Sequence, residues 1–191
     1  VCSSDLDSSA KAIVIRGLGL RLPSNIDDSE GLWQLIKAGS TALRPLPVHR
    51  IEEGGPAPAR IAGWLDDVAG FDATAFGLTA HEADALDPQQ RLILETATVA
   101  LDDAFITATD LKGRQVGIFV GFTNTDWQAR SLFSTHADSQ AIVGSSGSLA
   151  AGRLAYHLGI HGPVLTVDTA CSSGLVALHL AAASLRRGEC D

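Results

Sequence analysis

Residues 165–183, "LTVDTACSSGLVALHLAAA", decide the fold of this chain. A β-branched run that stops at Asp168 predicts a strand, and the almost wholly apolar segment after Gly174 predicts a helix. Small residues join the two and permit a tight strand-to-helix turn. Cys171 lies in this joint, so its thiol is either a reactive group or part of the packing.

Two properties of the joint favour a reactive Cys171. At the first turn of a helix, free N–H groups and the positive end of the dipole stabilise a thiolate over a thiol. The helix that follows is apolar nearly all round, so we expect it to be buried and to hold its first turn rigidly. The alternative is a buried structural cysteine, which is the commoner role of a single cysteine.

A cysteine nucleophile needs partners for proton transfer, and the sequence offers none nearby. His179 lies eight residues along the helix, roughly 12 Å away, and is expected to be a packed helix histidine. His157 and His161 have a metal-like spacing, but Gly159 between them argues against one continuous helix. We therefore predict no metal site, and local residues supply no convincing base.

The remaining pattern alternates strands with helices, which is typical of the α/β class. The predicted elements are a buried strand from Ala12, a helix from Ser29 that stops at Gly39, a surface loop over 44–60, a helix from Asp87 with Pro88 in its first turn, a strand over 115–123 buried on both faces, a helical small-residue segment over 145–157 and a strand over 164–168.

Composition excludes several function classes. The chain has 191 residues, with 14 basic and 22 acidic side chains and a formal net charge of −8, and the basic residues form no stripe. Nucleic-acid binding is therefore not expected. No apolar run reaches the length of a bilayer span, so we predict no membrane association. Three cysteines far apart in the sequence suit a reducing cytoplasm better than a disulfide framework.

Both ends of the sequence suggest a fragment. Methionine is absent, and "LRRGECD" at the end follows a helical pattern without a closing strand. The opening "VCSSDL" is what a common sequencing-adapter tail encodes when translated. We attribute residues 1–6 to sequence assembly and assign residues 7–191 to an incomplete domain.

Several long motifs resemble the β-ketoacyl synthases, the condensing enzymes of fatty-acid and polyketide synthesis. "VDTACSSG" followed by "LVALHLA" is similar to their active-site segment. In the same order as in the family come "IVIRGLGLRLP", "LWQLIKAGSTALRPLP", "FDATAFGLTAHEADALDPQQRLILE", "VGIFVGFTNTDW" and "AAGRLAYHLGIHGP". The segment ending in "DPQQRLILE" is most similar to type I polyketide synthases.

The resemblance implies the N-terminal half of a thiolase-like fold, with α/β/α layers, a mixed sheet and a buried central helix after the nucleophile. It implies that Cys171 attacks an acyl thioester and carries the acyl chain, with its backbone N–H in the oxyanion hole. A malonyl-type extender on acyl carrier protein then loses CO₂, assisted by two histidines of the family's second half, and its carbanion attacks the held acyl group. Phosphopantetheine thioesters are the implied substrates, a homodimer is the implied assembly, and no tightly bound cofactor is implied.

This chain departs from the family pattern at a few positions, none of them the nucleophile. Gly174 replaces a serine, Thr98 and Val99 replace a Trp-Glu pair, Phe105 replaces a glycine at a helix end, and Arg16 places a charge in the opening strand. Two alternatives to an elongating enzyme remain open, a non-elongating ketosynthase that passes the chain on and an inert carrier-docking domain. A hydrolase is disfavoured, because Thr169 and Ser173 occupy the glycine places of a nucleophile elbow. The 191-residue chain alone is expected to lack condensation activity and to be poorly soluble.

Overall fold

The computed structural model describes residues 12–47, 61–123, 126–132 and 139–191. The proposed assembly artefact at residues 1–6 and most of the predicted loop over 44–60 lie outside these ranges. In chain order, the elements are α1 (Ser29–Lys37), β1 (Arg44–Pro45), β2 (Ile61–Ala62), the 3₁₀ turn η2 (Thr74–Phe76), α2 (Ala80–Ala85), α3 (Pro88–Asp103), α4 (Ala108–Leu111), β3 (Ile118–Gly121), α5 (Asp126–Leu132), α6 (Ser139–Ser145), α7 (Leu149–Leu158), β4 (Val164–Val167), the 3₁₀ turn η3 (Ala170–Ser172) and α8 (Ser173–Arg187).

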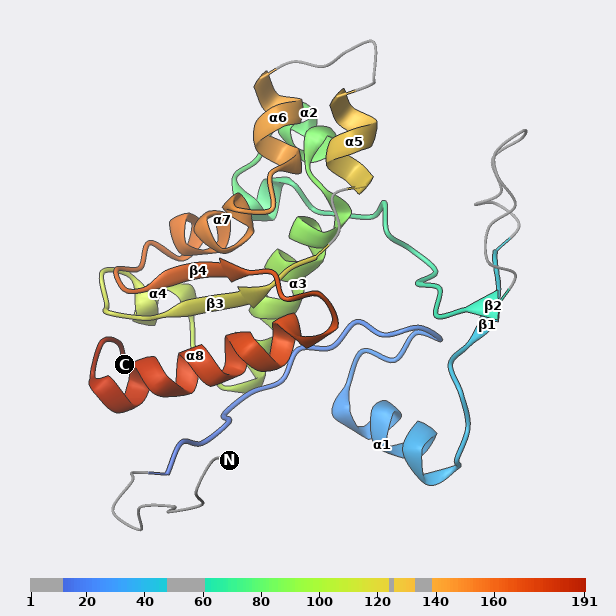
Figure 1. Ribbon diagram of the computed structural model, residues 1–191, viewed down its shortest axis with the longest axis horizontal. Helices are drawn as coiled ribbons and strands as arrows, with labels where there is room; N and C mark the ends of the chain where they lie inside the picture. The colour runs from blue at the N-terminus through green and yellow to red at the C-terminus, as the bar shows by residue number, and fades with distance from the viewer. Residues whose placement is uncertain (1–11, 48–60, 124–125, 133–138) are drawn as a thin grey trace.

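Strands β3 and β4 form a parallel pair at the centre of the chain. Ile118 pairs with Val164 and Gly121 pairs with Val167, and helices α5 to α7 make the crossover between the strands. Figure 1 shows α8 along one side of this pair, with α7 on the other side. The arrangement is the predicted α/β/α layering. Within the described residues, the second sheet is a separate antiparallel pair, β1 with β2.

The hydrophobic core lies where α3 and α7 meet the central strands. Its buried members are Leu86, Leu94, Ile118, Ala151, Leu154, Leu158 and Ile160. Small residues on α7 let this helix pack closely, as the small-residue segment predicts, although the helix begins at Leu149 and a separate helix, α6, ends at Ser145. These contacts fix the sheet from one side.

The predicted start of α3 is confirmed. Pro88 is the first helical residue, and the Asp87 carboxylate accepts a hydrogen bond from the Gln89 N–H at 2.8 Å. Burial raises the pKa of Asp87. The Gln90 amide is buried and donates to the carbonyls of Gly144 and Ser146, both at 3.0 Å, which ties α3 to the α6–α7 turn.

The predicted start and stop of α1 are also confirmed. The Asp28 side chain accepts from the Gly31 N–H at 2.7 Å, and Gly39 adopts a positive φ of 57° after the last turn. None of the residues of α1 is buried. The short strand at Arg44–Pro45 corrects the prediction of a loop throughout 44–60, because its backbone pairs with Ile61–Ala62.

The prediction of a buried strand from Ala12 is wrong. Among the described residues, this segment pairs with no strand, and Val14 and Ile15 are 75% and 71% exposed. It crosses α3 instead: a Cβ on Gly19 would lie 1.9 Å from the Thr96 carbonyl oxygen, and the Leu18 N–H donates to Asp103 at 2.9 Å. The glycine at position 19 therefore allows close contact between this segment and α3.

Two burial predictions also need correction. In β3, Ile118 is buried, whereas Phe119 and Val120 are half-buried, so the strand is not covered on both faces. Helix α8 packs one face on β3 and β4, but Leu175 and Leu178 on its outer face are 75% and 58% exposed. Among the described residues, β3 pairs with β4 alone, and no described element covers the outer side of α8. Within the described residues, no helix is both long and apolar enough to cross a bilayer.

Candidate active site

Cys171 lies at the carboxyl end of the parallel strand pair. Strand β4 ends at Val167, η3 holds Cys171 in a single 3₁₀ turn, and α8 continues from Ser173. The carboxyl ends of parallel strands are where α/β folds place their ligands. Cys171 is exposed and its thiol is free, so the alternative of a buried structural cysteine is wrong. The predicted position at the start of the helix is confirmed, with a 3₁₀ turn in place of the first α-turn.

Side chains of the joint itself hold the turn in place. The Asp168 carboxylate accepts from the Ala170 N–H at 3.0 Å, and the Ser172 hydroxyl donates to the Thr169 carbonyl at 2.8 Å. The Ser173 hydroxyl accepts from the Thr169 N–H at 2.9 Å and donates to the Ala170 carbonyl at 2.7 Å. The backbone beside the thiol is therefore fixed by residues within six positions of one another.

A glycine in the neighbouring strand lets the joint approach the sheet. A Cβ on Gly121 would lie 2.6 Å from the Gly174 backbone nitrogen and 2.7 Å from the Ser173 carbonyl carbon. Because the nearest atoms belong to the backbone, a side chain at this position would push the start of α8 away from β3. The absence of a side chain at Gly121 therefore allows the turn that carries Cys171 to pack closely on β3.

The histidines that the sequence singled out do not gather at Cys171. His179 is exposed on α8, so the prediction of a packed histidine is wrong; the helix face that carries it has no cover among the described elements. His157 packs against Phe76, with ring centroids 5.0 Å apart, and Gly159 ends α7 before the exposed His161. Within the described residues, the Cys171 sulfur has no hydrogen-bond partner, and no group of three or more His, Cys, Asp or Glu could hold a metal ion.

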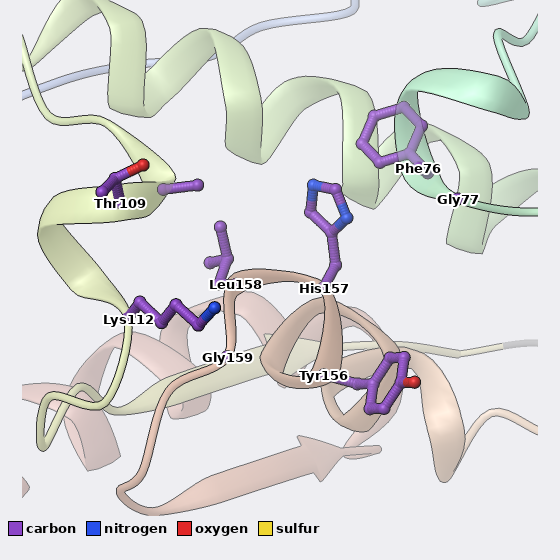
Figure 2. A pocket seen from close by; sticks show the side chains of 9 residues that line it. Phe76, Gly77, Thr109, Lys112, Tyr156, His157, Leu158 and Gly159 are labelled. Carbon is purple, nitrogen blue, oxygen red and sulfur yellow. The ribbon is translucent and has the colours of Figure 1, made fainter.

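A separate hollow of about 480 Å³ lies between η2, α4 and the end of α7 (Figure 2). The Lys112 amine and the His157 ring point toward it, whereas the Tyr156 ring points away. Helix α4 precedes β3 in the chain and helix α7 precedes β4, so the hollow lies near the amino ends of these strands. Cys171 instead follows the carboxyl end of β4. None of its described lining residues carries a carboxylate or a thiol. The hollow is therefore distinct from the Cys171 site.

A group of charged hydrogen-bonding side chains lies at the far end of α8. Both oxygens of Glu189 accept hydrogen bonds from Arg187, at 2.6 and 2.8 Å, and Ser184 donates a third at 2.7 Å. The Arg187 and Ser184 hydrogen bonds lower the pKa of Glu189 to about 2. Next to this group, the buried Cys190 packs against Gly117. These contacts anchor the end of α8 that lies away from Cys171.

Comparison with known proteins decides the family. The sequence pattern described as "Beta-ketoacyl synthase, N-terminal domain" matches residues 10–191. The chain belongs to the β-ketoacyl synthase family. This ketoacyl synthase chain is 45% identical over 188 residues to the spectinabilin polyketide synthase system protein NorA of Streptomyces orinoci, covering 93% of the chain and 10% of NorA. It is 43% identical over 191 residues to the pikromycin polyketide synthase component PikAII of Streptomyces venezuelae, covering 93% of the chain and 5% of PikAII.

Solved ketosynthase domains share the fold. The ketosynthase chain superposes on the oxazolomycin ketosynthase domain OzmH KS7 of Streptomyces albus JA3453 with a TM-score of 0.81 and 33% identity, covering 93% of the chain and 33% of that domain's chain. The ketosynthase from module 6 of the bacillaene synthase of Bacillus subtilis 168 gives a TM-score of 0.79 and 30% identity, with 93% and 30% covered. The predicted thiolase-like fold is thereby confirmed, and the chain spans about a third of these domains' chains.

The sequence located the thiol but missed the residues that hold it. The sequence predicts Ser173 only as a small residue of the joint, Asp168 as the end of a strand and Gly121 as part of an apolar strand. No local signal reveals their contacts, since Ser173 bonds backward along the chain and Gly121 lies 53 positions before the Gly174 nitrogen that it approaches. The side chain of Asp168 was the nearest to a signal, because Asp commonly bonds the backbone two residues on.

Proposed function

We propose that residues 7–191 are the N-terminal region of an elongating β-ketoacyl synthase in a polyketide synthase, with Cys171 as the acyl-carrying nucleophile. The observation that supports this most is the exposed Cys171 thiol, free at the carboxyl end of the strands on a turn held by hydrogen bonds. The sequence relatives are polyketide synthase proteins, and the bacillaene ketosynthase was also solved with one cysteine replaced by serine.

In the proposed first step, the Cys171 sulfur attacks the carbonyl carbon of an acyl thioester. The C–S bond to phosphopantetheine breaks, the acyl group is left on Cys171, and the thiol proton ends on the departing phosphopantetheine sulfur. The backbone N–H of Cys171 donates to the oxygen that becomes negative in the tetrahedral intermediate. The free end of the turn, with its small neighbours, leaves room for the acyl group.

In the second step, a malonyl-type extender on acyl carrier protein loses CO₂. The electron pair left on its α-carbon attacks the Cys171 acyl carbon, and the Cys171 C–S bond breaks to give a β-ketoacyl thioester and the Cys171 thiolate, which takes up a proton from water. Two histidines assist this step in the family, and we assign them to the part of the domain that this chain does not span. The 191-residue chain alone is therefore expected to be inactive.

The same proposal covers the partners and setting of the domain. Acyl carrier protein is the proposed partner, acyl and malonyl-type phosphopantetheine thioesters are the substrates, and no tightly bound cofactor is needed for this chemistry. A homodimer is the proposed assembly of the complete domain. The free thiols of Cys171 and Cys190 support a cytoplasmic location.

The test uses a complete ketosynthase domain that carries this chain. Incubation with a short acyl thioester should add one acyl group, detected by intact-mass spectrometry and mapped to Cys171. Cys171→Ala should lose the adduct entirely, whereas Cys190→Ala, which removes the buried thiol, should keep it. An adduct that survives Cys171→Ala contradicts the proposal.

A second measurement separates the alternatives. After loading, malonyl-type carrier protein should convert the adduct to a β-ketoacyl product. Loading without this product indicates a non-elongating ketosynthase, and failure to load at all indicates a docking domain. Either result rejects the elongating function.

A further inference from the structure

Ser173 is the most enclosed polar side chain near Cys171. It is 5% exposed at the start of α8, where its hydroxyl makes two hydrogen bonds to the backbone of the preceding turn. It accepts from the Thr169 N–H at 2.9 Å and donates to the Ala170 carbonyl at 2.7 Å. Both the donor and the acceptor capacity of this buried hydroxyl are therefore used inside the joint.

The residue that these bonds enclose has an unfavourable backbone conformation. Ala170 adopts a φ of 54°, in the left-handed region, where a side chain clashes with its own backbone. Such conformations persist where surrounding contacts impose them. The Thr169 N–H lies on the N-terminal side of Ala170 and the Ala170 carbonyl on its C-terminal side, so the Ser173 hydroxyl fixes both sides of the rotated bond. Cys171 is the next residue.

Ser172 provides a comparison within the same turn. Its side chain is exposed, and its hydroxyl reaches the Thr169 carbonyl at 2.8 Å and the Thr169 hydroxyl at 2.9 Å. Both partners belong to one residue on the N-terminal side of Ala170. These bonds also span Ala170, but they are exposed to water, so we expect them to restrain Ala170 less than the buried bonds of Ser173 do.

We propose that Ser173 is a positioning residue for Cys171. It holds Ala170 in the left-handed conformation, and this conformation presents the Cys171 sulfur to the incoming thioester. The inference rests on the proposed function, because it assumes that Cys171 is the nucleophile. Gly121 allows the start of α8 to pack against β3, and this contact fixes the position of the Ser173 backbone.

The experiment compares Ser173→Ala with Ser172→Ala in the complete ketosynthase domain. For acylation by a short acyl thioester, Ser173→Ala should lower kcat about tenfold and leave KM unchanged, since the substrate still binds but meets a misplaced sulfur. Ser172→Ala should lower kcat by a smaller factor than Ser173→Ala, because its hydrogen bonds are exposed to water. Equal kcat values for the two variants, or a loss confined to KM, overturn the inference.

A double variant tests whether Ser173 acts through the backbone conformation of Ala170. Glycine adopts the left-handed conformation without strain, so Ala170→Gly removes much of the need for the restraint. In the Ala170→Gly background, Ser173→Ala should lower kcat by less than about threefold. The same tenfold loss in both backgrounds would show that Ser173 acts otherwise than through Ala170, and would overturn the inference.

Amide hydrogen exchange separates a failure of this inference from a failure of the proposed function. Exchange in the peptide that covers residues 169–173 should be at least about tenfold faster in Ser173→Ala than in Ser172→Ala, whether or not Cys171 accepts an acyl group. If Cys171 never loads, the proposed function fails and the exchange rates still decide whether Ser173 holds the turn. Unchanged exchange in Ser173→Ala overturns the inference even where Cys171 loads normally.

Discussion

The two helices that flank the central strands have very different surroundings. Helix α7 packs against α3 as well as against the central strands, and its residues Ala150, Ala151 and Leu154 are buried. Helix α8 packs on the strands by one face and exposes Leu175 and Leu178 on the other. Figure 1 shows α7 and α8 on opposite sides of the β3–β4 pair.

This difference shows what a local apolar pattern can and cannot predict. The sequence of α8 is apolar on all sides, as expected of a helix inside a larger core. The chain spans about a third of the solved ketosynthase domains it matches, and we infer that the rest of such a domain covers the outer face. The exposed leucines would then be an interface within one fold.

The largest predicted effect contrasts one leucine from each side. Leu94 is 1% exposed in the α3–α7 core, and Leu94→Ala should destabilise the protein by about 2–5 kcal/mol through lost burial and a cavity. Leu175→Ala should change the stability of the 191-residue chain by less than about 0.5 kcal/mol, because this side chain is already in water. Urea unfolding of both variants measures the two values.

The complete domain then tests the inferred cover over α8. If the outer face is buried there, Leu175→Ala should cost about 2 kcal/mol or more, in contrast with its small effect in the chain alone. The same small effect in both settings would show that the face stays open. Poor solubility of the isolated chain, relieved by Leu175→Ser, would agree with a face that requires cover.

A smaller effect, of opposite sign, is predicted at the end of α3. Phe105 adopts a φ of 56° with its ring 94% exposed, so the residue carries backbone strain and makes little compensating contact. Phe105→Gly should stabilise the protein by about 0.5–1 kcal/mol. Relief of the backbone strain stabilises the folded state, and the greater conformational entropy of glycine in the unfolded state offsets part of this gain. Phe105→Ala keeps the strain and should change stability little. Thermal unfolding compares the two, and equal effects would contradict the strain argument.

The smallest predicted effect concerns pH and the anchored end of α8. The pKa of Glu189 is lowered to about 2 by Arg187 and Ser184, from an ordinary value of 4.5. A carboxyl with a lowered folded pKa adds stability above its unfolded pKa and loses it as pH falls toward the folded value. The advantage of the parent protein over Glu189→Gln should therefore be constant near neutral pH and shrink between about pH 4.5 and pH 2.

Urea midpoints taken across this pH range check the prediction. Arg187→Gln should remove the same pH-dependent advantage, because Arg187 is the first cause of the lowered pKa. Arg186→Gln, next to it on α8, should leave the advantage in place. A parent protein whose acid response matches that of Glu189→Gln would show that the ion pair does not contribute.

Local sequence signals correctly predicted the ends of elements that are fixed by contacts within a few residues. Asp87 and Pro88 mark the start of α3, Gly39 the end of α1, and the β-branched run before Asp168 the strand β4, because caps and turns act within a few residues. The glycine that Phe105 replaces was also recognised, and the structure explains it by the positive φ. Wrong predictions concern burial: Val14, Ile15 and the outer face of α8 depend on partners elsewhere in the fold.

The amino-acid sequence by itself determined the α/β class, the family and the place of Cys171 between a strand and a helix. Each of these is written in residues adjacent or close in the chain. Only the tertiary structure decided that Ala170 is left-handed, that Ser173 encloses it and that Gly121 admits the start of α8. Those features depend on backbone angles and on atoms brought together across the fold, and no single stretch of sequence encodes either.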